Sequence, residues 1–205
     1  MDNQDNSIQA VIIDLGGVLL RTEDRAPRTE LAARFGMTYD ESSDLVFYNQ
    51  SAKEATLGLI SAEAHWEAVC QALKIPADQI QNLRHDFFAG DHLDDNLVNY
   101  LRHLRPPIKT ALLSNAWDDL RAMLIEFWKV EDAFDELIIS ADVKIAKPDP
   151  RIFQLTLSRL DVPAHRAVFI DDAIENVTAA HKIGLRTIQF FNPAQALSEL
   201  EILLN

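Results

Sequence analysis

The sequence is short of the residues that would stabilise or target a protein outside the cell. Cys70 is the only cysteine among 205 residues, so no disulfide can form within the chain and we expect a reducing compartment. Residues 1–7 are polar and lack the basic and apolar regions of a signal peptide. The most apolar segment, residues 10–20, contains Asp14 and is too short to cross a bilayer. These absences predict a cytoplasmic protein that has no membrane partner.

Positive charge is also scarce in this chain. There are 19 Lys and Arg residues against 32 Asp and Glu residues, which gives a formal net charge of −13. Binding to nucleic acid needs concentrated Lys and Arg, so we expect no nucleic-acid partner, and an anionic membrane surface is disfavoured too. A small anionic ligand remains compatible with this charge, because a metal ion, a Lys side chain or a helix N-terminus can reverse the local field.

The apolar residues, 48% of the chain, follow two different patterns along it. After an expected strand at 8–13, residues 23–95 show no strand pattern, and their apolar residues recur at helical spacing over 29–35, 40–50, 62–73 and 77–88. From residue 108 onwards, expected strands at 108–113, 137–139, 167–170 and 187–190 alternate with expected helices at 118–128, 151–160, 174–183 and 196–203.

The second pattern predicts the fold class. Apolar strands that alternate with helices form a doubly wound parallel sheet, buried on both faces. We therefore predict an α/β core made of residues 1–20 and 96–205, with residues 21–95 inserted as an all-helical subdomain. Right-handed crossovers place the C-terminal ends of the strands on one edge of the sheet, where such folds bind their ligands.

Polar side chains suited to phosphoryl transfer follow three of the expected strands. They are Asp14 after 8–13, Ser114 and Asn115 after 108–113, and Asp171 and Asp172 after 167–170. Asp14 either starts a turn or is a carboxylate nucleophile that forms an acyl phosphate. The two glycines at 16 and 17 let the backbone approach a transferring group and direct amides at its oxygens.

The other segments also have two interpretations each. Ser114 and Asn115 either bind phosphate or cap the next helix. Lys147 stands in a Lys-Pro-Asp-Pro segment whose prolines restrict the backbone before a helix; it either points toward the sheet edge or is a solvated surface Lys. Asp171 and Asp172 either cap a helix or hold a cation, because adjacent carboxylates repel each other without one. Carboxylate oxygens are the ligands that Mg²⁺ prefers.

The order and context of these four segments resemble the haloacid dehalogenase (HAD) superfamily of phosphohydrolases, and the resemblance covers nearly the whole chain. It implies a Rossmannoid core and a helical cap of four-helix type, with hinges near 21–25 and 90–95. The resemblance also implies roles for single residues. Asp14 is the catalytic nucleophile, and the phosphate-binding residues are Ser114, Asn115 and Lys147, of which Lys147 is also a catalytic cation. The metal ligands are Asp14, Asp172, which binds Mg²⁺ directly, the Gly16 carbonyl, and Asp171, which binds through water or orients Lys147.

One position departs from the pattern of this family. Gly16 stands where the family's first motif carries a second Asp, which protonates the leaving oxygen; such an acid is worth ~10²–10⁴-fold in rate. A D-L-G-G-V opening also resembles a branch that includes sugar-1-phosphate phosphatases, whose leaving groups depend less on the missing acid. Glu23, Asp24 and His92, near the expected hinges, are candidates for a substitute acid, although surface solvation explains each of them as well.

The sequence thus predicts a Mg²⁺-dependent phosphohydrolase that acts on a small phosphorylated metabolite through an aspartyl-phosphate intermediate. The alternative is a catalytically weak relative that binds phosphate or a partner protein. A phosphorylatable signalling receiver is disfavoured, because its acidic pair precedes the phosphorylated Asp whereas here the order is reversed. Trp117, just after the second segment, either lines the substrate pocket or packs in the interior.

Overall fold

The computed structural model describes residues 7–205, so the polar N-terminal segment, except for Ser7, lies outside the described residues. Five parallel strands form the central sheet in the order β5-β4-β1-β6-β7. They are β1 (Ala10–Ile13), β4 (Lys109–Ser114), β5 (Glu136–Ile139), β6 (Ala167–Asp171) and β7 (Arg186–Gln189). Because β1 lies in the centre and the chain winds outward to both sides of it, the predicted doubly wound α/β fold is confirmed.

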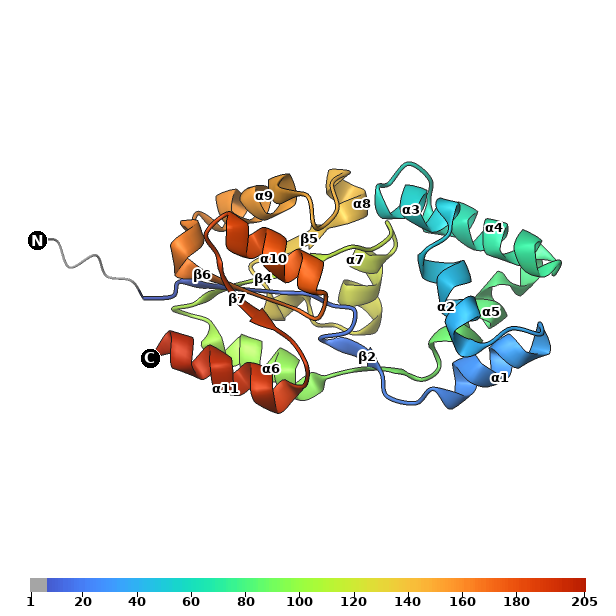
Figure 1. Cartoon of the computed structure of the whole chain (residues 1–205), viewed down its shortest axis with the longest axis horizontal. Coiled ribbons are helices and arrows are strands. Elements are labelled where there is room, and N and C mark those ends of the chain that lie inside the picture. Colours follow the sequence, from blue (N-terminus) through green and yellow to red (C-terminus); the bar gives the residue numbers. More distant parts are fainter. Residues whose placement is uncertain (1–6) are drawn as a thin grey trace, which may run out of the picture.

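Helices cover both faces of this sheet (Figure 1). The longer ones are α6 (Asp95–Leu104), α9 (Pro150–Leu160), α10 (Ile174–Lys182) and α11 (Pro193–Leu204). Short helical segments complete the core: α7 (Leu120–Ala122), the π-helical η2 (Met123–Phe127), η3 (Glu131–Ala133), α8 (Ser140–Val143) and η4 (Ala164–Arg166). No helix among residues 7–205 combines the length and the apolar character that a membrane span needs.

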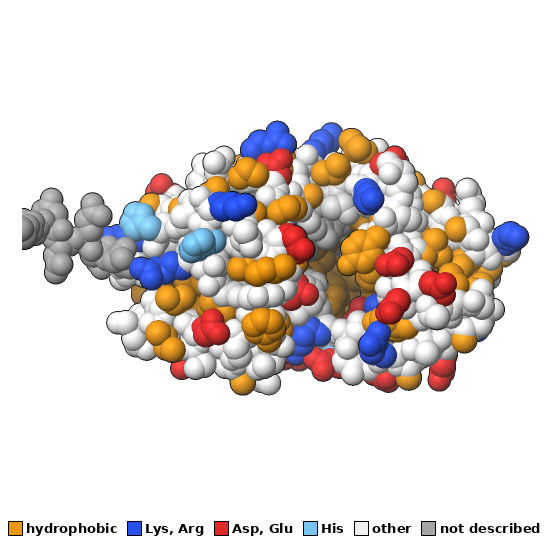
Figure 2. All heavy atoms as spheres, in the orientation of Figure 1, with side chains coloured by type: hydrophobic (Ala, Val, Ile, Leu, Met, Phe, Trp, Pro, Cys, Tyr) orange, Lys and Arg blue, Asp and Glu red, His pale blue; other side chains and the backbone are white. Residues whose placement is uncertain are grey.

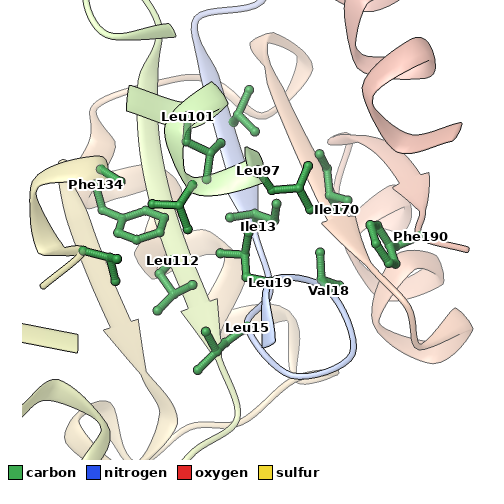
Figure 3. Packing of buried hydrophobic residues seen from close by; sticks show 14 of the residues in the cluster. Ile13, Leu15, Val18, Leu19, Leu97, Leu101, Leu112, Phe134, Ile170 and Phe190 are labelled. Carbon is green, nitrogen blue, oxygen red and sulfur yellow. The ribbon is translucent and has the colours of Figure 1, made fainter. Parts of the chain in front are cut away.

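The alternation of side chains along β1 decides which helices pack on which face. Val11 and Ile13 point into a cluster with α6 and α11, whereas Ala10 and Ile12 point into a cluster with α9 and α10. Figure 3 shows the first cluster, in which Ile13 lies beside Leu97 of α6. Since the central strand is buried on both faces, the sheet is a rigid support for whatever follows the strand ends.

The inserted subdomain, which we call the cap, lies beside the end of the sheet (Figure 1). It consists of α1 (Ala26–Arg34), α2 (Tyr39–Phe47), α3 (Gln50–Thr56), α4 (Ala62–Leu73), η1 (Ala77–Gln79) and α5 (Ile80–Phe88). The cap has its own hydrophobic cluster, which includes Trp66, Cys70 and Phe87. Two antiparallel strands, β2 (Leu20–Thr22) and β3 (Asp91–Leu93), connect it to the core.

The structure corrects several sequence expectations. β3 is a strand within the segment where none was expected, because its backbone pairs with β2, some 70 residues earlier. The single helix expected at 40–50 is interrupted, since the Asn49 side chain accepts from the amide of Ala52 and begins α3. Helix α6 was not predicted, although Asp94 caps it through the amide of Leu97. The helix expected at 118–128 is shorter and ends in the π-helical segment η2.

Candidate active site

Three strand ends converge at the edge of the sheet that faces the cap. The register pairs Ile13 of β1 with Leu112 of β4 and with Ile170 of β6, so the residues that follow these positions lie side by side. Asp14 follows β1, whereas Ser114 and Asp171 are the last residues of β4 and β6. All three are buried. Figure 2 shows a hollow in the surface between the core and the cap.

A buried ammonium group joins two of these strand ends. Lys147 Nζ lies 2.7 Å from Asp14 Oδ1 and 2.7 Å from Asp171 Oδ2, and its side chain is 1% exposed. The interpretation of Lys147 as a solvated surface residue is therefore wrong. Asn176 Nδ2 donates to both carboxylate oxygens of Asp171, at 3.1 Å each, which fixes the orientation of that carboxylate.

The backbone of Lys147 is held by the side chain of Asn115. Asn115 Nδ2 donates to the Lys147 carbonyl, and the Lys147 amide donates to Asn115 Oδ1, each at 2.8 Å. Asn115 therefore does not cap the next helix, which begins only at Leu120. The side-chain amide of Asn115 is engaged with Lys147, so only the backbone amide of Asn115 is left to bind phosphate. That contribution stays a prediction. The predicted role of Ser114 as a phosphate ligand likewise stays a prediction.

Three carboxylates are close enough to share one cation. Asp14, Asp171 and Asp172 each offer an oxygen within 4.8 Å of the others. Burial raises the pKa of Asp14 to about 7, and although Lys147 lowers this pKa, Asp171 raises it further. Burial and the neighbouring Asp171 also raise the pKa of Asp172. The negative charge of the cluster is thus costly without a counter-ion, and a set of carboxylate oxygens fits Mg²⁺.

The two glycines after Asp14 have different surroundings. A Cβ on Gly17 would lie 2.3 Å from Asp172 Oδ2, and the φ of Gly17 is +78°, so this position requires glycine. A Cβ on Gly16 would meet no atom within 4 Å, and Gly16 is not among the glycines with positive φ. The structure therefore leaves room for a side chain at the position where the second Asp was expected. The Gly16 carbonyl as a metal ligand stays a prediction.

Two of the residues predicted as substitutes for the missing acid have other contacts near β2 and α1. Glu23 forms an ion pair with Arg21 at 2.8 Å. Asp24 Oδ1 accepts from the amide of Ala26 at the start of α1. His92 is exposed on β3. The assignment of any of them as an acid stays a prediction, and the ion pair of Glu23 and the hydrogen bond of Asp24 account for these two residues without it.

Sequence reasoning missed how the segment after β4 meets the cap. Trp117 packs into the hydrophobic cluster of the cap, with its ring centroid 4.6 Å from that of His65 and 5.8 Å from that of Trp66, which confirms the packing interpretation. Asp118 and Asp119 contact the cap helices α4 and α5. Their spacing in the sequence carries no signal for these contacts, because the partners lie 35 and 56 residues away.

Comparisons with known proteins show the family to which this chain belongs. The family model described as haloacid dehalogenase-like hydrolase matches residues 8–184. The D-ribitol-5-phosphate phosphatase of Bacteroides thetaiotaomicron is 24% identical over 208 residues, which cover 97% of this chain and 99% of that protein. Mouse acyl-CoA dehydrogenase family member 10 is 45% identical over 71 residues, which cover 35% of this chain. The chain matches only 7% of that protein and 17% of mouse bifunctional epoxide hydrolase 2, both much longer relatives.

A solved structure shows the same fold. The crystal structure of a HAD family enzyme from Bacteroides thetaiotaomicron, in complex with magnesium and inorganic phosphate, superposes with a TM-score of 0.76 at 23% identity. The superposition covers 93% of this chain and 99% of that one. The two chains therefore share a fold across this distance in sequence.

Proposed function

Because the chain belongs to the haloacid dehalogenase-like hydrolases, we propose that it is a Mg²⁺-dependent phosphatase that hydrolyses a small phosphorylated metabolite through an aspartyl phosphate on Asp14. The observation that carries this proposal is the position of Lys147 Nζ, 2.7 Å from both Asp14 and Asp171 in the carboxylate cluster. The match over almost the full length to a protein named as a phosphatase supports the same reaction class.

The residues present suit the first half of this reaction. Asp14 attacks the phosphorus atom through one carboxylate oxygen, while the bond from phosphorus to the leaving oxygen breaks. Lys147 neutralises charge on the nucleophile and on the phosphoryl oxygens, and the Ser114 hydroxyl at the end of β4 donates to one of those oxygens. Asp14, Asp171 and Asp172 would hold Mg²⁺, which would supply further positive charge when bound. The leaving oxygen takes its proton from solvent, since Gly16 offers none.

The second half restores the enzyme. A water molecule attacks the phosphorus of the aspartyl phosphate, the bond between Asp14 and phosphorus breaks, and inorganic phosphate leaves. Asp14 is again a carboxylate, and no oxidant or second substrate is consumed. Because the departing group leaves with more negative charge than in an acid-assisted reaction, acyl, aryl and anomeric phosphates should react faster than simple alkyl phosphates.

The experiment that tests this function has a binding arm and a turnover arm. Beryllium fluoride, which mimics a phosphoryl group on a carboxylate, should bind in the presence of Mg²⁺, and Asp14→Asn should abolish that binding. Hydrolysis of a panel of acyl, aryl, anomeric and alkyl phosphates should require Mg²⁺ and disappear in Asp14→Asn. A matched control is Asp40→Asn, since Asp40 is an exposed cap residue. Undiminished turnover by Asp14→Asn would refute the nucleophile. A wild type that binds the mimic without turnover would favour the phosphate-binding alternative, and one inert in both arms would favour the protein-binding alternative.

A further inference from the structure

A five-residue loop between β4 and α7 contacts both the cap and Lys147. We call residues 115–119 the 115–119 loop. It begins one residue after the active-site Ser114 and ends one residue before α7. Its first residue, Asn115, holds the backbone of Lys147 through two hydrogen bonds of 2.8 Å. Its last three residues contact the cap.

The contacts with the cap involve packing, a helix cap and an ion pair. Trp117 lies against His65 and Trp66 of α4. Asp118 Oδ1 accepts from the amide of Ala62, the first residue of α4, at 2.8 Å. Asp119 forms an ion pair with Arg84 of α5. Three consecutive core residues thus fix the position of two cap helices, and two of them use charges that suit their partners.

The core side of the loop is equally well connected. The amide of Ala116 donates to Ser140 Oγ at 3.0 Å, and the carbonyl of Ala116 accepts from Ser140 Oγ and from the amide of Ala141. Ser140 and Ala141 begin α8, which ends four residues before Lys147. Gly58, in the turn between α3 and α4, makes a second contact of the cap here. A Cβ on Gly58 would lie 2.2 Å from the Ala141 carbonyl oxygen.

The cap thus contacts the core at the 115–119 loop and, through Gly58, at α8. The loop is bonded to Lys147 through Asn115, and α8 precedes Lys147 in the chain. Because the 115–119 loop is short and bonded at both ends, movement of the cap must either break the contacts of Trp117, Asp118 and Asp119 or displace Asn115. A displacement of Asn115 moves the Lys147 backbone, and Nζ must keep two partners at 2.7 Å. We infer that Trp117, Asp118 and Asp119 are positioning residues that couple the position of the cap to the placement of Lys147, through Asn115. The consequence for catalysis rests on the proposed function, whereas the coupling itself does not.

Hydrogen exchange in the full-length, metal-free chain tests the coupling without any substrate. Arg84→Glu and Asp118→Ala should each accelerate amide exchange in α4 and α5 and also, by about two- to thirtyfold, in residues 144–149. The double variant Arg84→Glu/Asp119→Arg should return the exchange of 144–149 toward wild type. Asp118→Asn, unlike Asp118→Ala, should leave the exchange of 144–149 close to wild type, because the amide oxygen of Asn can still accept from the amide of Ala62.

The matched control is another ion pair of the cap. Arg34→Glu breaks the pair between Arg34 of α1 and Asp86 of α5, 2.8 Å apart, which does not touch the 115–119 loop. It should accelerate exchange within the cap only. In an Asn115→Ala background, Arg84→Glu should no longer affect residues 144–149.

Exchange at 144–149 that stays at the wild-type rate while α4 and α5 exchange faster would overturn the coupling. So would an equal response to Arg34→Glu, since that would reflect general loosening of the cap. A response that survives Asn115→Ala would refute the route through Asn115. The binding of beryllium fluoride tests Asp14 separately, so a failure of the coupling and a failure of the proposed phosphatase activity are distinguishable.

Discussion

The core and the cap each bury a cation, and the two cations have different surroundings. In the core, Lys147 lies between two carboxylates at the strand ends and next to Asp172, in a cluster that carries more negative than positive charge. In the cap, Arg28 Nη2 donates to both carboxylate oxygens of Asp91, whereas Nε donates to the Phe87 carbonyl and Nη1 to the Tyr39 hydroxyl. Each nitrogen of the Arg28 guanidinium donates within the cap or to β3, whereas the Lys147 cluster is suited to a cation and a phosphoryl group.

This difference separates stability from chemistry. A buried charge that is paired and hydrogen-bonded matters for folding chiefly because its removal leaves the charge of its partner buried and uncompensated. A buried charge in an unbalanced cluster can also bind a ligand that restores the balance. We therefore expect substitutions of the two cations to affect different measurements.

The largest expected effect is on activity, in Lys147→Met. The Met side chain has a similar length and carries no charge, so Asp14 and the phosphoryl group repel each other and turnover should fall about 10³-fold. The measurement is kcat on the best phosphate ester of the panel, for protein shown to be folded by circular dichroism. Turnover within tenfold of wild type would place the essential positive charge elsewhere.

The corresponding substitution in the cap, Arg28→Met, should mainly affect stability. It leaves Asp91 without its buried partner, and such a loss costs about 3–5 kcal/mol. Thermal or denaturant unfolding measures the change, and the activity of the fraction that remains folded should stay near wild type. The comparison between the two cations fails if Arg28→Met unfolds like wild type while its turnover collapses.

A smaller gain in activity is expected from Gly16→Asp. The space at Gly16 and its backbone conformation accept a side chain, so the new carboxyl can protonate a leaving oxygen. Hydrolysis of alkyl phosphates should rise by up to about 10²-fold, and the dependence of rate on leaving-group acidity should flatten. Gly17→Asp is the matched control, because it adds the same carboxyl at the neighbouring position. Its Cβ would collide with Asp172, so this variant should show no gain in the hydrolysis of alkyl phosphates. A folded Gly16→Asp enzyme with an unchanged profile would contradict the missing-acid account.

The smallest expected effect is the response of the cap to acid. Burial lowers the pKa of His65 from 6.5; Arg84 lowers it further, and the Val46 carbonyl and Asp119 oppose the shift. Ser51 Oγ lies 2.8 Å from Nδ1 of this ring. The unfolded chain takes up a proton at His65 below pH 6.5 before the folded chain does, so stability should decrease as the pH falls through 6.5.

His65→Phe removes this titration while it keeps a ring beside Trp117. The melting temperature of the variant should fall less than that of wild type between pH 7 and pH 5, and exchange rates in α4 should report the same difference. Parallel pH profiles for the two proteins would show that His65 does not contribute to the acid response.

Much of the fold and of the candidate site could be predicted from local patterns. Short apolar runs located β1, β4, β5, β6 and β7 to within about two residues, and the topology of parallel sheets then required Asp14, Ser114 and Asp171 to share one edge. The capping of α4 is also a local feature, because the Ser61 side chain accepts from the amide of Ala64, three residues later. β3 could not be predicted in this way, because a three-residue strand gains its hydrogen bonds from a partner about 70 residues away.

The sequence by itself determined which chemical groups stand at the strand ends, since the alternation of strands and helices fixes that edge before any contact is known. Only the tertiary structure decided what each group does there. The side-chain amide of Asn115 holds the backbone of Lys147, 32 residues along the chain, whereas phosphate binding by the Asn115 backbone stays a prediction. Asp118 and Asp119, which carry no motif, fix the cap through Ala62 and Arg84. Such contacts depend on the packing of distant segments, and the spacing of residues along a chain does not encode their geometry.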